Sequence, residues 1–557
     1  MMTYGKPSSG ASGKLPFIGR VVNVVPGDCV VIERALDLRE DAYLADHTLV
    51  HAQGAKPLTA CLPVMPMTMS VEAMAEVAAC VAPGLGLVGV EEVKASRWIE
   101  LLDTETALLK IFAKGAGRDA ERDATCVSAA IYVNGAESPS ITAKFLFAPN
   151  YLLELLSVFE TIDEVRASRI DSSQLYAERH LFHGPAFQCL TGDILIDENR
   201  IKATLAVPVT DRLFNSNDDP QLLLQPAVLD NICQIVGVWA MESERYAFPV
   251  GLGKLELYRP TPAPGACVTA RVELTRTQGK MLHADVEIQD GEGGVWMRLH
   301  DLRCWKFQSE RRVINYRRAP EQFLLSQPVP IGCSASGLLA LLLDEEDLGV
   351  FDPRMLARDC LSVEELQIYE HHARFHKRQR QWLLGRAVAK DCVRLWRARR
   401  YQHEMAHPAA VIIRTDASGR PFVSTLGSQS EDADVRISIS HCDGRAIAIA
   451  HDAPVGIDVE RVVPRDDDFI DAIASSSERA LLYNLPAAER DQWVTRLWSA
   501  KEALAKRLSI GVGRQLKVFE SIELSADGRI SILDRQSERL YEVMTVLDQE
   551  YIISCAL

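Results

Sequence analysis

The sequence predicts an α+β protein with a strand-rich first part and an α/β second part. Three observations support this prediction. Short segments that alternate apolar and polar residues dominate up to about residue 307, and only two apolar helical segments interrupt them. After about residue 333, strand-like segments alternate with long helical ones. The length of 557 residues also exceeds that of a typical single domain.

The composition is that of a soluble, core-forming chain, with 47% hydrophobic and 25% charged residues. The 13 cysteines include no CxxC pair, so we expect reduced thiols in the cytoplasm rather than a disulfide framework. No apolar run approaches the roughly 20 residues of a membrane helix, which predicts no membrane partner. The net charge of −15 disfavours general binding to nucleic acid, because such binding depends on neutralising phosphate.

Residues 1–14 form a Gly/Ser-rich lead that we expect to be disordered. From residue 15 to 307, one apolar helix with a set of antiparallel strands occurs twice, and a sheet wrapped around one such helix is the hotdog arrangement. The sequence therefore predicts a double hotdog, with halves at about 15–150 and 165–307. The predicted helices are Met69–Val81 and Pro226–Met241, and the predicted strands are 21–38, 107–115, 126–133, 141–148, 201–209, 267–277, 283–291 and 295–307.

Four short stretches of this part carry polar residues in a recurring context. They are LADHTLV, LPVMPMTMSVE, FHGPAFQ and QPAVLDNICQ, and together they resemble the active-site segments of polyketide synthase dehydratase domains. The resemblance implies that His47 takes the α-proton of a 3-hydroxyacyl thioester and that Asp230 protonates the departing hydroxyl. Gln234 follows Asp230 at i+4, so it would share a helix face with this carboxyl and hold it or the hydroxyl.

Such a site must hold a neutral base and a protonated acid together. We expect the apolar helix to desolvate Asp230 and to keep it protonated near neutral pH. The alternatives are a structural His47 and an Asp230 that caps its helix. A product-template or other hotdog domain that binds the chain without dehydrating it is the runner-up for this part.

The first part also departs from the dehydratase pattern. About ten extra residues separate His47 from Pro66. Met67 replaces a glycine, and Gln225 a histidine; His183 stands where the pattern has a tyrosine. His51 on the inserted loop is a rival for the base, but the preceding L-x-D favours His47.

Residues 308–332 mix charge and proline without sustained periodicity, so we expect a linker there.

Beyond the linker, residues 446–460 are predicted to form a strand on which Asp458 and Glu460, at i and i+2, point to one face. Residues 495–508 are rich in helix formers and place Trp498, Glu502 and Lys506 on one helical face. Carboxylates with a nearby ammonium suit Mg²⁺ and phosphate.

The words GIDVE and WSAKEALAK, with RISISHCDG upstream, resemble the signatures of the Sfp-type 4′-phosphopantetheinyl transferases. These enzymes move the phosphopantetheine arm of coenzyme A onto a serine of an acyl carrier protein. The resemblance implies a pseudo-two-fold α/β domain at 333–557, with Mg²⁺ held by Asp458, Glu460 and Glu502.

The same resemblance implies roles for the neighbouring residues. Lys501 and Lys506 would face the phosphates or the attacking serine, with Glu502 or its bound water as general base. Ser440 and His441 would lie beside the coenzyme A phosphates.

A basic stripe at residues 374–400 carries ten Lys or Arg and one acid, Asp391. Its WLLGR word resembles the transferase segment that contacts the 3′-phosphoadenosine of coenzyme A, which makes Arg380 and Arg386 candidates. A solvated helix face and a steering surface for an acidic carrier protein are alternatives, and a nucleic-acid arm is a third.

A dehydratase followed by a phosphopantetheinyl transferase resembles the C-terminal end of enediyne-type iterative polyketide synthases. We therefore expect a bifunctional enzyme of polyketide or fatty-acid assembly that acts on an acyl carrier protein, uses coenzyme A and Mg²⁺, and dimerises through its hotdog domain. A docking scaffold with an inactive transferase is the alternative from another class.

Overall fold

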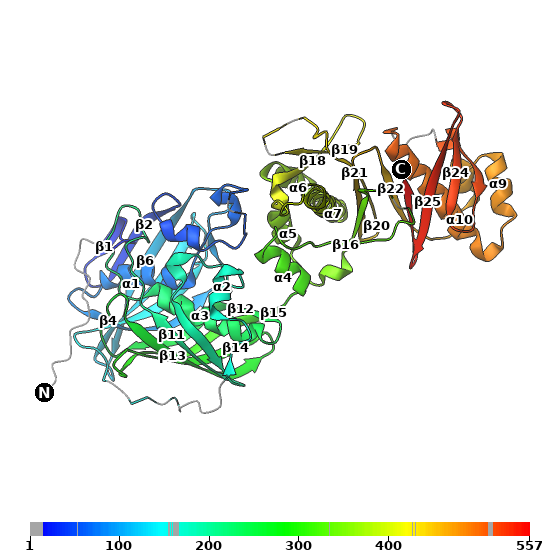
Figure 1. The fold of residues 1–557 in the computed structure, drawn as a ribbon. Coiled ribbons are helices and arrows are strands. Elements are labelled where there is room, and N and C mark those ends of the chain that lie inside the picture. Colours follow the sequence, from blue (N-terminus) through cyan, green and yellow to red (C-terminus); the bar gives the residue numbers. More distant parts are fainter. Residues whose placement is uncertain are drawn as a thin grey trace. The chain divides into compact units, whose positions relative to one another are not determined.

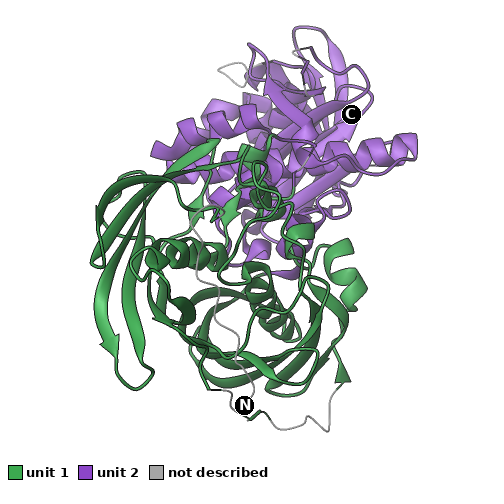
Figure 2. Ribbon diagram, turned by 90° about the vertical axis from the view of Figure 1, so that its left-hand side faces the viewer, with its two compact units in different colours: residues 1–51, 57–309 green, residues 52–56, 310–557 purple. Residues whose placement is uncertain are grey.

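The computed structural model describes residues 15–52, 54–153, 156–157, 159, 166–333, 335–425, 427–428, 430–510 and 516–557. The lead at residues 1–14, expected to be disordered, lies outside these residues. The chain divides into two compact units, one of residues 1–51 and 57–309 and one of residues 52–56 and 310–557 (Figure 2). We call them unit 1 and unit 2 and describe each by itself.

Unit 1 is built on a 13-stranded antiparallel sheet in the order β1-β2-β6-β7-β8-β4-β12-β15-β14-β13-β11-β10-β9 (Figure 1). The first six strands in this order form one half, and the other seven form the second half. The strands of the first half are β1 (Arg20–Val25), β2 (Cys29–Asp37), β4 (Gly86–Ala95), β6 (Thr106–Asp119), β7 (Ala124–Val133) and β8 (Ile141–Ala148). Those of the second half are β9 (Arg166–Ala167), β10 (Leu190–Ile196), β11 (Arg200–Ala206), β12 (Arg245–Leu257), β13 (Cys267–Gln278), β14 (Met281–Gln289) and β15 (Val295–Gln308).

Each half of the sheet covers one apolar helix. α1 (Met67–Ala79) packs against β2, β4, β6, β7 and β8, whereas α3 (Pro226–Met241) packs against β10, β11 and β12. The two helices also contact each other, and nearly all of their side chains are buried. The predicted double hotdog is therefore confirmed. Shorter elements are β3 (Val64–Met65), β5 (Ile99–Glu100) and α2 (Ser172–Ala177).

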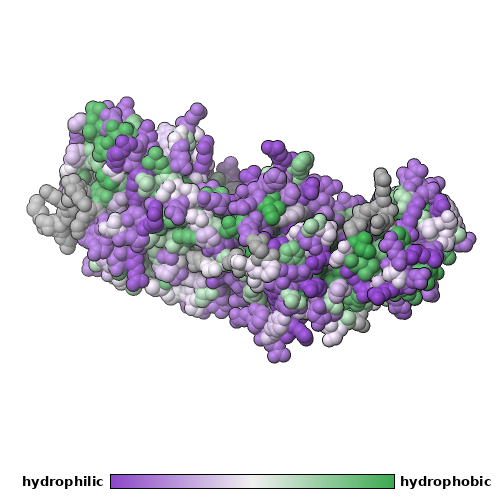
Figure 3. All heavy atoms as spheres, turned by 90° about the horizontal axis from the view of Figure 1, so that it is seen from above, coloured by the Kyte–Doolittle hydropathy of each residue, from purple (hydrophilic) through white to green (hydrophobic). Residues whose placement is uncertain are grey.

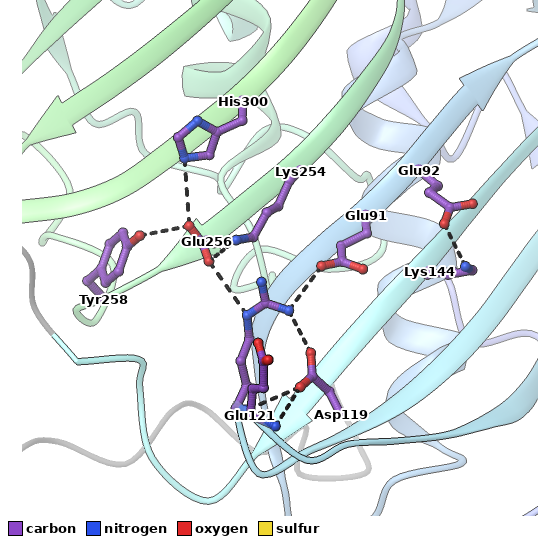
Figure 4. A network of polar contacts seen from close by, with 10 residues as sticks. Glu91, Glu92, Asp119, Glu121, Lys144, Lys254, Glu256, Tyr258 and His300 are labelled. Carbon is purple, nitrogen blue, oxygen red and sulfur yellow. Dashed lines mark hydrogen bonds and ion pairs between the residues drawn. The ribbon is translucent and has the colours of Figure 1, made fainter.

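The two halves join where β4 pairs with β12, and the predicted strands include neither of these two. Both segments carry glycines, and Pro249 also interrupts β12, which hides the alternating pattern. Figure 4 shows a polar network at this seam. The Arg122 guanidinium lies 3.3 Å from Glu91 on β4 and 3.7 Å from Glu256 on β12. Ion pairs thus link the two halves beside their hydrogen-bonded strands.

Unit 2 consists of two sheets, each covered by one long helix. The order is β16-β17-β21-β20 in one sheet and β22-β26-β25-β24-β23 in the other. α7 (His376–Tyr401) packs on the first sheet, and α10 (Ala487–Arg507) packs on the second. The strands are β16 (Gln327–Pro328), β17 (Leu339–Asp344), β20 (Arg436–Cys442), β21 (Arg445–His451), β22 (Gly456–Arg461), β23 (Phe519–Leu524), β24 (Arg529–Asp534), β25 (Arg539–Asp548) and β26 (Tyr551–Ala556).

Smaller elements complete unit 2. A separate hairpin consists of β18 and β19, and short helices flank the two sheets. These elements are α4 (Arg311–Arg318), α5 (Pro353–Cys360), α6 (Val363–His371), β18 (Val411–Thr415), β19 (Pro421–Thr425), α8 (Asp467–Ile473) and α9 (Ser476–Tyr483).

The segment expected to be a linker, residues 308–332, is instead part of unit 2 from Glu310 onward. Tyr316 on α4 is fully buried in the core around α7. The backbone N–H groups of Leu325 and Ser326 donate to the buried Asp391 carboxylate at 2.8 and 3.0 Å. The buried apolar residues of this segment are isolated and follow neither a helical nor a strand spacing. The hydrophobic periodicity of the sequence therefore could not predict that the segment packs against unit 2.

Hydrophilic residues dominate the face shown in Figure 3, and the hydrophobic ones form small patches. Among the described residues, no helix is long and apolar enough to cross a membrane.

Candidate active sites

Asp458 on β22 is the buried centre of a polar cluster in unit 2. Its Oδ1 accepts a hydrogen bond from the Ser440 hydroxyl at 2.8 Å and another from the Lys506 ammonium at 2.7 Å. β20, β22 and α10 therefore meet at one carboxylate. Its Oδ2 is buried and has no protein partner, so one acceptor of this carboxylate is left for a group outside the chain.

The glycine of the GIDVE word lets α10 pack directly on β22. A Cβ at Gly456 would lie 1.8 Å from the carbonyl oxygen of Ala503 on α10, so any larger residue would push the helix away. This close approach brings Glu502 on the helix next to the carboxylates of the strand.

The Asp458 carboxylate raises the pKa values of two nearby carboxyls, Glu502 and Glu460. Burial raises the pKa of Glu502 to about 7, and the neighbouring Asp458 carboxylate contributes to this shift. Burial and Asp458 also raise the pKa of Glu460, whose Oε2 lies 3.6 Å from the Arg465 guanidinium. Crowded carboxylates of this kind favour a positive charge among them.

The donor set fits a hard divalent cation that enters together with a phosphate ligand. Among the described residues, only a trio in unit 1 has ligand atoms that all lie within 4.8 Å of one another, so Asp458, Glu460 and Glu502 do not close around one point. The Lys506 ammonium already supplies positive charge at Asp458. Mg²⁺ needs only one or two protein carboxylates and takes its other ligands from water and phosphate, so the buried, unpartnered Oδ2 of Asp458 suits it.

Lys501 does not belong to this cluster, which corrects the expectation that it faces the phosphates. Its ammonium is fully buried and lies 2.9 Å from Glu478 Oε2 and 2.7 Å from the carbonyl oxygen of Ile473. Adjacent residues of a helix point about 100° apart, so Lys501 faces away while Glu502 faces β22. Its pair with Glu478 fastens α10 to α9.

Besides Ser440, two of the other three candidates for anion binding lie near this cluster. Burial lowers the pKa of His441, and the charges of Lys506 and Arg386 lower it further, so these cations gather around the imidazole. The Nε of Arg386 is buried without a protein partner, and its guanidinium lies over the Trp382 ring at 4.8 Å. Arg380 is instead paired with Glu345 and is partly exposed. Arg386 is thus the better placed of the two arginines.

The basic stripe on α7 is less open than its sequence indicates. Lys390 is fully buried against Glu365, with 2.5 Å between Nζ and Oε2. Arg394 is likewise buried and bonds Asp391 at 2.9 Å. The buried cations Lys390 and Arg394 therefore interrupt the stripe, so a continuous steering surface is not present along these residues.

In unit 1, His47 ends a 3-10 turn and faces an apolar pocket. Its Nδ1 lies 2.7 Å from the carbonyl oxygen of Val64, so Nδ1 carries the proton and Nε2 keeps its lone pair. Burial lowers the pKa of His47 to about 4, and His183 contributes to this shift. His47 is therefore a neutral imidazole at neutral pH. His51, the rival base, is not among the residues that line the pocket.

Asp46, the residue before His47, connects the LADH motif to the HGPAF motif. The Asp46 carboxylate accepts a hydrogen bond from the backbone N–H of Ala186 at 2.9 Å, and its backbone carbonyl accepts one from Gly184 at 2.7 Å. A Cβ at Gly184 would lie 2.2 Å from Asp46 Oδ1, so this position requires glycine. The LADH word thus holds the HGPAF turn beside His47.

Asp230 lies near the start of α3 and is almost fully buried. Gln234, one turn later, donates from Nε2 to Asp230 Oδ2 at 2.8 Å. The Tyr176 hydroxyl donates to Gln234 Oε1 at 2.7 Å. The structure thus places Gln234 on the face of Asp230, as its spacing predicts. Tyr176 has no motif around it, and nothing in the sequence indicates its contact.

The ionisation of Asp230 differs from the expectation. Burial alone raises its pKa, but His183, His47 and Gln234 together outweigh burial and lower the pKa below the usual value. His183 Nε2 lies 3.2 Å from Asp230 Oδ2. The prediction that burial keeps Asp230 protonated is therefore wrong for the free site. The histidine that replaces a tyrosine in the HGP motif, His183, is the sequence feature that could have indicated its pairing with Asp230.

The pocket at these residues has a volume of about 160 Å³ and mostly apolar walls. The His47 ring packs edge-on against Phe182 and Phe187, at 5.0 and 5.6 Å between ring centroids. Trp98 and Phe248 also line the pocket and contact each other edge-on at 6.2 Å. Such walls suit an acyl chain, with polar groups confined to the reacting end.

Two protein families match parts of this chain. Residues 160–312 match the family described as polyketide synthase dehydratase N-terminal domain, a range that contains His183, Asp230 and Gln234 but not His47. Residues 454–556 match the 4′-phosphopantetheinyl transferase superfamily, a range that contains Asp458, Glu460, Glu502 and Lys506.

Relatives of this chain include bacterial enzymes with transferase or carrier-protein synthase names. The chain is 30% identical over 155 residues to the 4′-phosphopantetheinyl transferase psf-1 of Bacillus pumilus, covering 28% of this chain and 60% of that protein. It is 28% identical over 160 residues to Sfp of Bacillus subtilis, covering 28% of this chain and 65% of that protein. A holo-[acyl-carrier-protein] synthase of Geobacillus kaustophilus is 31% identical over 108 residues, which are 18% of this chain and 83% of that protein. The chain thus spans about 60 to 65% of the first two relatives.

Solved structures similar to this chain include polyketide synthase dehydratase domains. The domain from the CurF module of curacin polyketide synthase matches with a TM-score of 0.41 and 18% identity, over 53% of this chain and all of that domain. The dehydratase domain of PpsC from Mycobacterium tuberculosis matches with a TM-score of 0.40 and 19% identity, again over 53% of this chain and all of that domain.

Proposed function

Because this chain belongs to the 4′-phosphopantetheinyl transferase superfamily and carries a polyketide synthase dehydratase domain, we propose that it is a bifunctional enzyme of polyketide or fatty-acid assembly. Unit 2 transfers 4′-phosphopantetheine from coenzyme A to a serine of an acyl carrier protein. Unit 1 dehydrates 3-hydroxyacyl thioesters on such a carrier to enoyl thioesters. We place both reactions in the cytoplasm, in line with the reduced thiols that the cysteine pattern of the sequence predicts.

The Asp458 cluster carries the transferase proposal. Asp458 joins β20, β22 and α10 and keeps one buried oxygen without a protein partner, next to two glutamates with raised pKa values. A purely structural core does not require such a costly group of buried carboxylates. Asp458, Glu460 and Glu502 would hold Mg²⁺, directly or through its water ligands, and the ion would neutralise the charge of the coenzyme A diphosphate.

The protein's own groups would then act around the diphosphate. Lys506 places an ammonium beside Asp458, and Arg386 and His441 offer donors for the phosphates of coenzyme A. Glu502, or a water that it orients, removes the proton of the carrier serine. The serine oxygen bonds to the β-phosphorus as the P–O bond to adenosine 3′,5′-bisphosphate breaks.

For dehydration, the neutral imidazole of His47 carries the proposal. Its Nε2 lone pair takes the α-proton, and the C–O bond of the 3-hydroxyl breaks. The departing hydroxide receives a proton from the Asp230–His183 pair and leaves as water. Gln234 keeps the Asp230 carboxyl in place during this transfer.

A homodimer through the hotdog domain belongs to the same proposal. β1 lies at one edge of the 13-stranded sheet, and all six of its residues are exposed. Val21 and Val24 are more than half exposed there, which suits pairing with a second chain. Light scattering at two protein concentrations would give the mass of a dimer, whereas a monomer at both concentrations would contradict this part.

Two assays test the two activities separately. An apo-carrier incubated with coenzyme A should gain one phosphopantetheinyl group when Mg²⁺ is present and none when EDTA removes it. A 3-hydroxyacyl carrier should yield the enoyl product with the wild type but not with His47→Ala. Absence of enoyl product from the wild type would leave unit 1 as a chain-binding domain.

A further inference from the structure

We propose that His47, His183 and Asp230 form a binding site for one divalent transition-metal ion of the class that imidazole ligands prefer, with Zn²⁺ as its representative. The two histidines and the carboxylate each offer one ligand atom, and these atoms all lie within 4.8 Å of one another. No other trio of His, Cys, Asp or Glu in the described part of the chain meets this condition. Two imidazoles with one carboxylate form a set that such ions bind while open positions remain.

The hydrogen bond of His47 presents the right nitrogen to an ion. Its Nδ1–H donates to the carbonyl oxygen of Val64 at 2.7 Å, which leaves the Nε2 lone pair free. Histidines that ligate metals usually donate their other N–H to a carbonyl or carboxylate in this way, because the bond fixes the ring. His47 therefore has the outer partner that a metal ligand needs.

Asp230 and His183 supply the other two ligand atoms, and the Nδ1 of His183 is buried without a protein partner. His183 Nε2 lies 3.2 Å from Asp230 Oδ2, close to the roughly 3.4 Å that separates neighbouring ligand atoms around a tetrahedral Zn²⁺ with bonds of about 2.0–2.1 Å. Gln234 Nε2 donates to the same carboxylate oxygen, Oδ2, at 2.8 Å and fixes the orientation of the carboxylate. Both ligands are more than nine-tenths buried, so water competes little for the ion.

His183 supplies the third ligand of this site. It stands where the dehydratase pattern has a tyrosine, and a tyrosine there would leave only His47 and Asp230. An ion bound here would occupy the Nε2 lone pair that the proposed dehydration needs. The site thus goes beyond the proposed function and makes unit 1 sensitive to transition metals, whereas binding itself does not require that dehydration occurs.

Calorimetric titration of the full chain with Zn²⁺ tests the proposal, in the presence of excess Mg²⁺ to occupy the oxygen-rich site of unit 2. Wild type should bind one Zn²⁺ in this titration, and Co²⁺ in its place should give visible absorption bands of an imidazole-ligated ion. His183→Tyr should weaken binding by more than about 100-fold, beyond the 10- to 100-fold that loss of an outer-shell partner causes. His180→Ala, at another histidine that lines the pocket, should bind like wild type.

Folding and activity controls keep the test decisive. Far-UV circular dichroism should show the same fold for wild type and His183→Tyr, and Asp230→Asn offers a second ligand change that conserves volume. Wild-type affinity in both variants, or no Zn²⁺ bound by the wild type, would overturn the proposal. Because no substrate is used, failure of the dehydration assay would not affect this result.

Discussion

The hydroxyl of Ser440 donates a 2.8 Å hydrogen bond to Oδ1 of Asp458, and this bond joins a strand of one sheet of unit 2 to a strand of the other. Both residues are buried, so the bond is shielded from water. A proposed metal ligand is therefore held by a residue from the opposite half of the fold.

Ser440→Ala should lower the rate of carrier loading without unfolding the chain. Hydrogen bonds to charged groups are worth about 1.5–3 kcal/mol, so kcat/KM should fall roughly 10- to 100-fold. Loading rates measured by carrier mass over a range of coenzyme A concentrations would check this. A variant as fast as wild type would show that Asp458 needs no support from β20.

The two lysines of α10 should separate into a functional and a structural residue. Lys506→Met removes the ammonium beside Asp458 and should abolish loading while the unfolding transition stays near that of wild type. Lys501→Met breaks a fully buried ion pair with Glu478 and should cost about 3–5 kcal/mol of unfolding free energy.

Urea unfolding curves and loading assays on both variants would make this comparison. The double variant Lys501→Met/Glu478→Gln should recover part of the lost stability, because no unpaired charge then remains. If Lys501→Met were stable but inactive, Lys501 would act on substrate after all.

Gly184→Ala should damage unit 1 and spare unit 2. A methyl group there would lie 2.2 Å from Asp46 Oδ1, so the turn that carries His183 must shift. Dehydration should be lost while carrier loading continues. Gly237→Ala on α3 is the matched control, since its new Cβ would lie 3.9 Å from the nearest atom outside its own helix. This control should be as stable as wild type or more so, because alanine favours a helix.

The stability of unit 1 should depend on pH through Glu72 and Glu76 on α1. Burial raises the pKa of Glu72 from 4.5 to about 8, and burial and Glu72 raise that of Glu76. A carboxyl whose folded pKa lies above its unfolded value stabilises the fold fully below about pH 4.5 and loses this contribution as pH rises through about 8. The unfolding free energy should therefore fall by an amount on the order of 1–3 kcal/mol between pH 5 and pH 8.

Glu76→Gln should flatten this dependence, because the amide keeps an acceptor for the backbone N–H of Phe17 but cannot ionise. Glu137→Gln, at an exposed position, is the control and should follow wild type. Denaturant curves at pH 5, 6.5 and 8 give the comparison. Equal slopes for wild type and Glu76→Gln would exclude this carboxyl as the cause.

The sequence predicted those parts of the fold and sites that depend on local spacing. The i, i+2 pair on a strand and the i, i+4 residues on a helix placed Asp458 and Glu502 on facing elements, and Gln234 one turn after Asp230. Apolar periodicity likewise located both buried helices of unit 1, although α1 starts two residues earlier than predicted, at Met67.

Contacts between distant segments could not be predicted in this way. The bond between Ser440 and Asp458 and the hydroxyl of Tyr176 on Gln234 depend on tertiary packing alone. The resemblance to the transferase motif also assigned Lys501 to the phosphates, although its side chain points away from that of Glu502 on the helix. The β4 and β12 strands were not predicted, because glycine and proline interrupt their alternation of apolar and polar residues.

Carrier loading by Glu502→Gln tests the central claim most directly. The variant keeps the shape of the side chain but removes the charge that we assign to metal binding and proton transfer, so we expect a carrier of unchanged mass after incubation with coenzyme A and Mg²⁺. Wild type under the same conditions should convert the carrier to the phosphopantetheinyl form. If Glu502→Gln loaded the carrier at the wild-type rate, the acidic cluster around Asp458 would not be the transferase site.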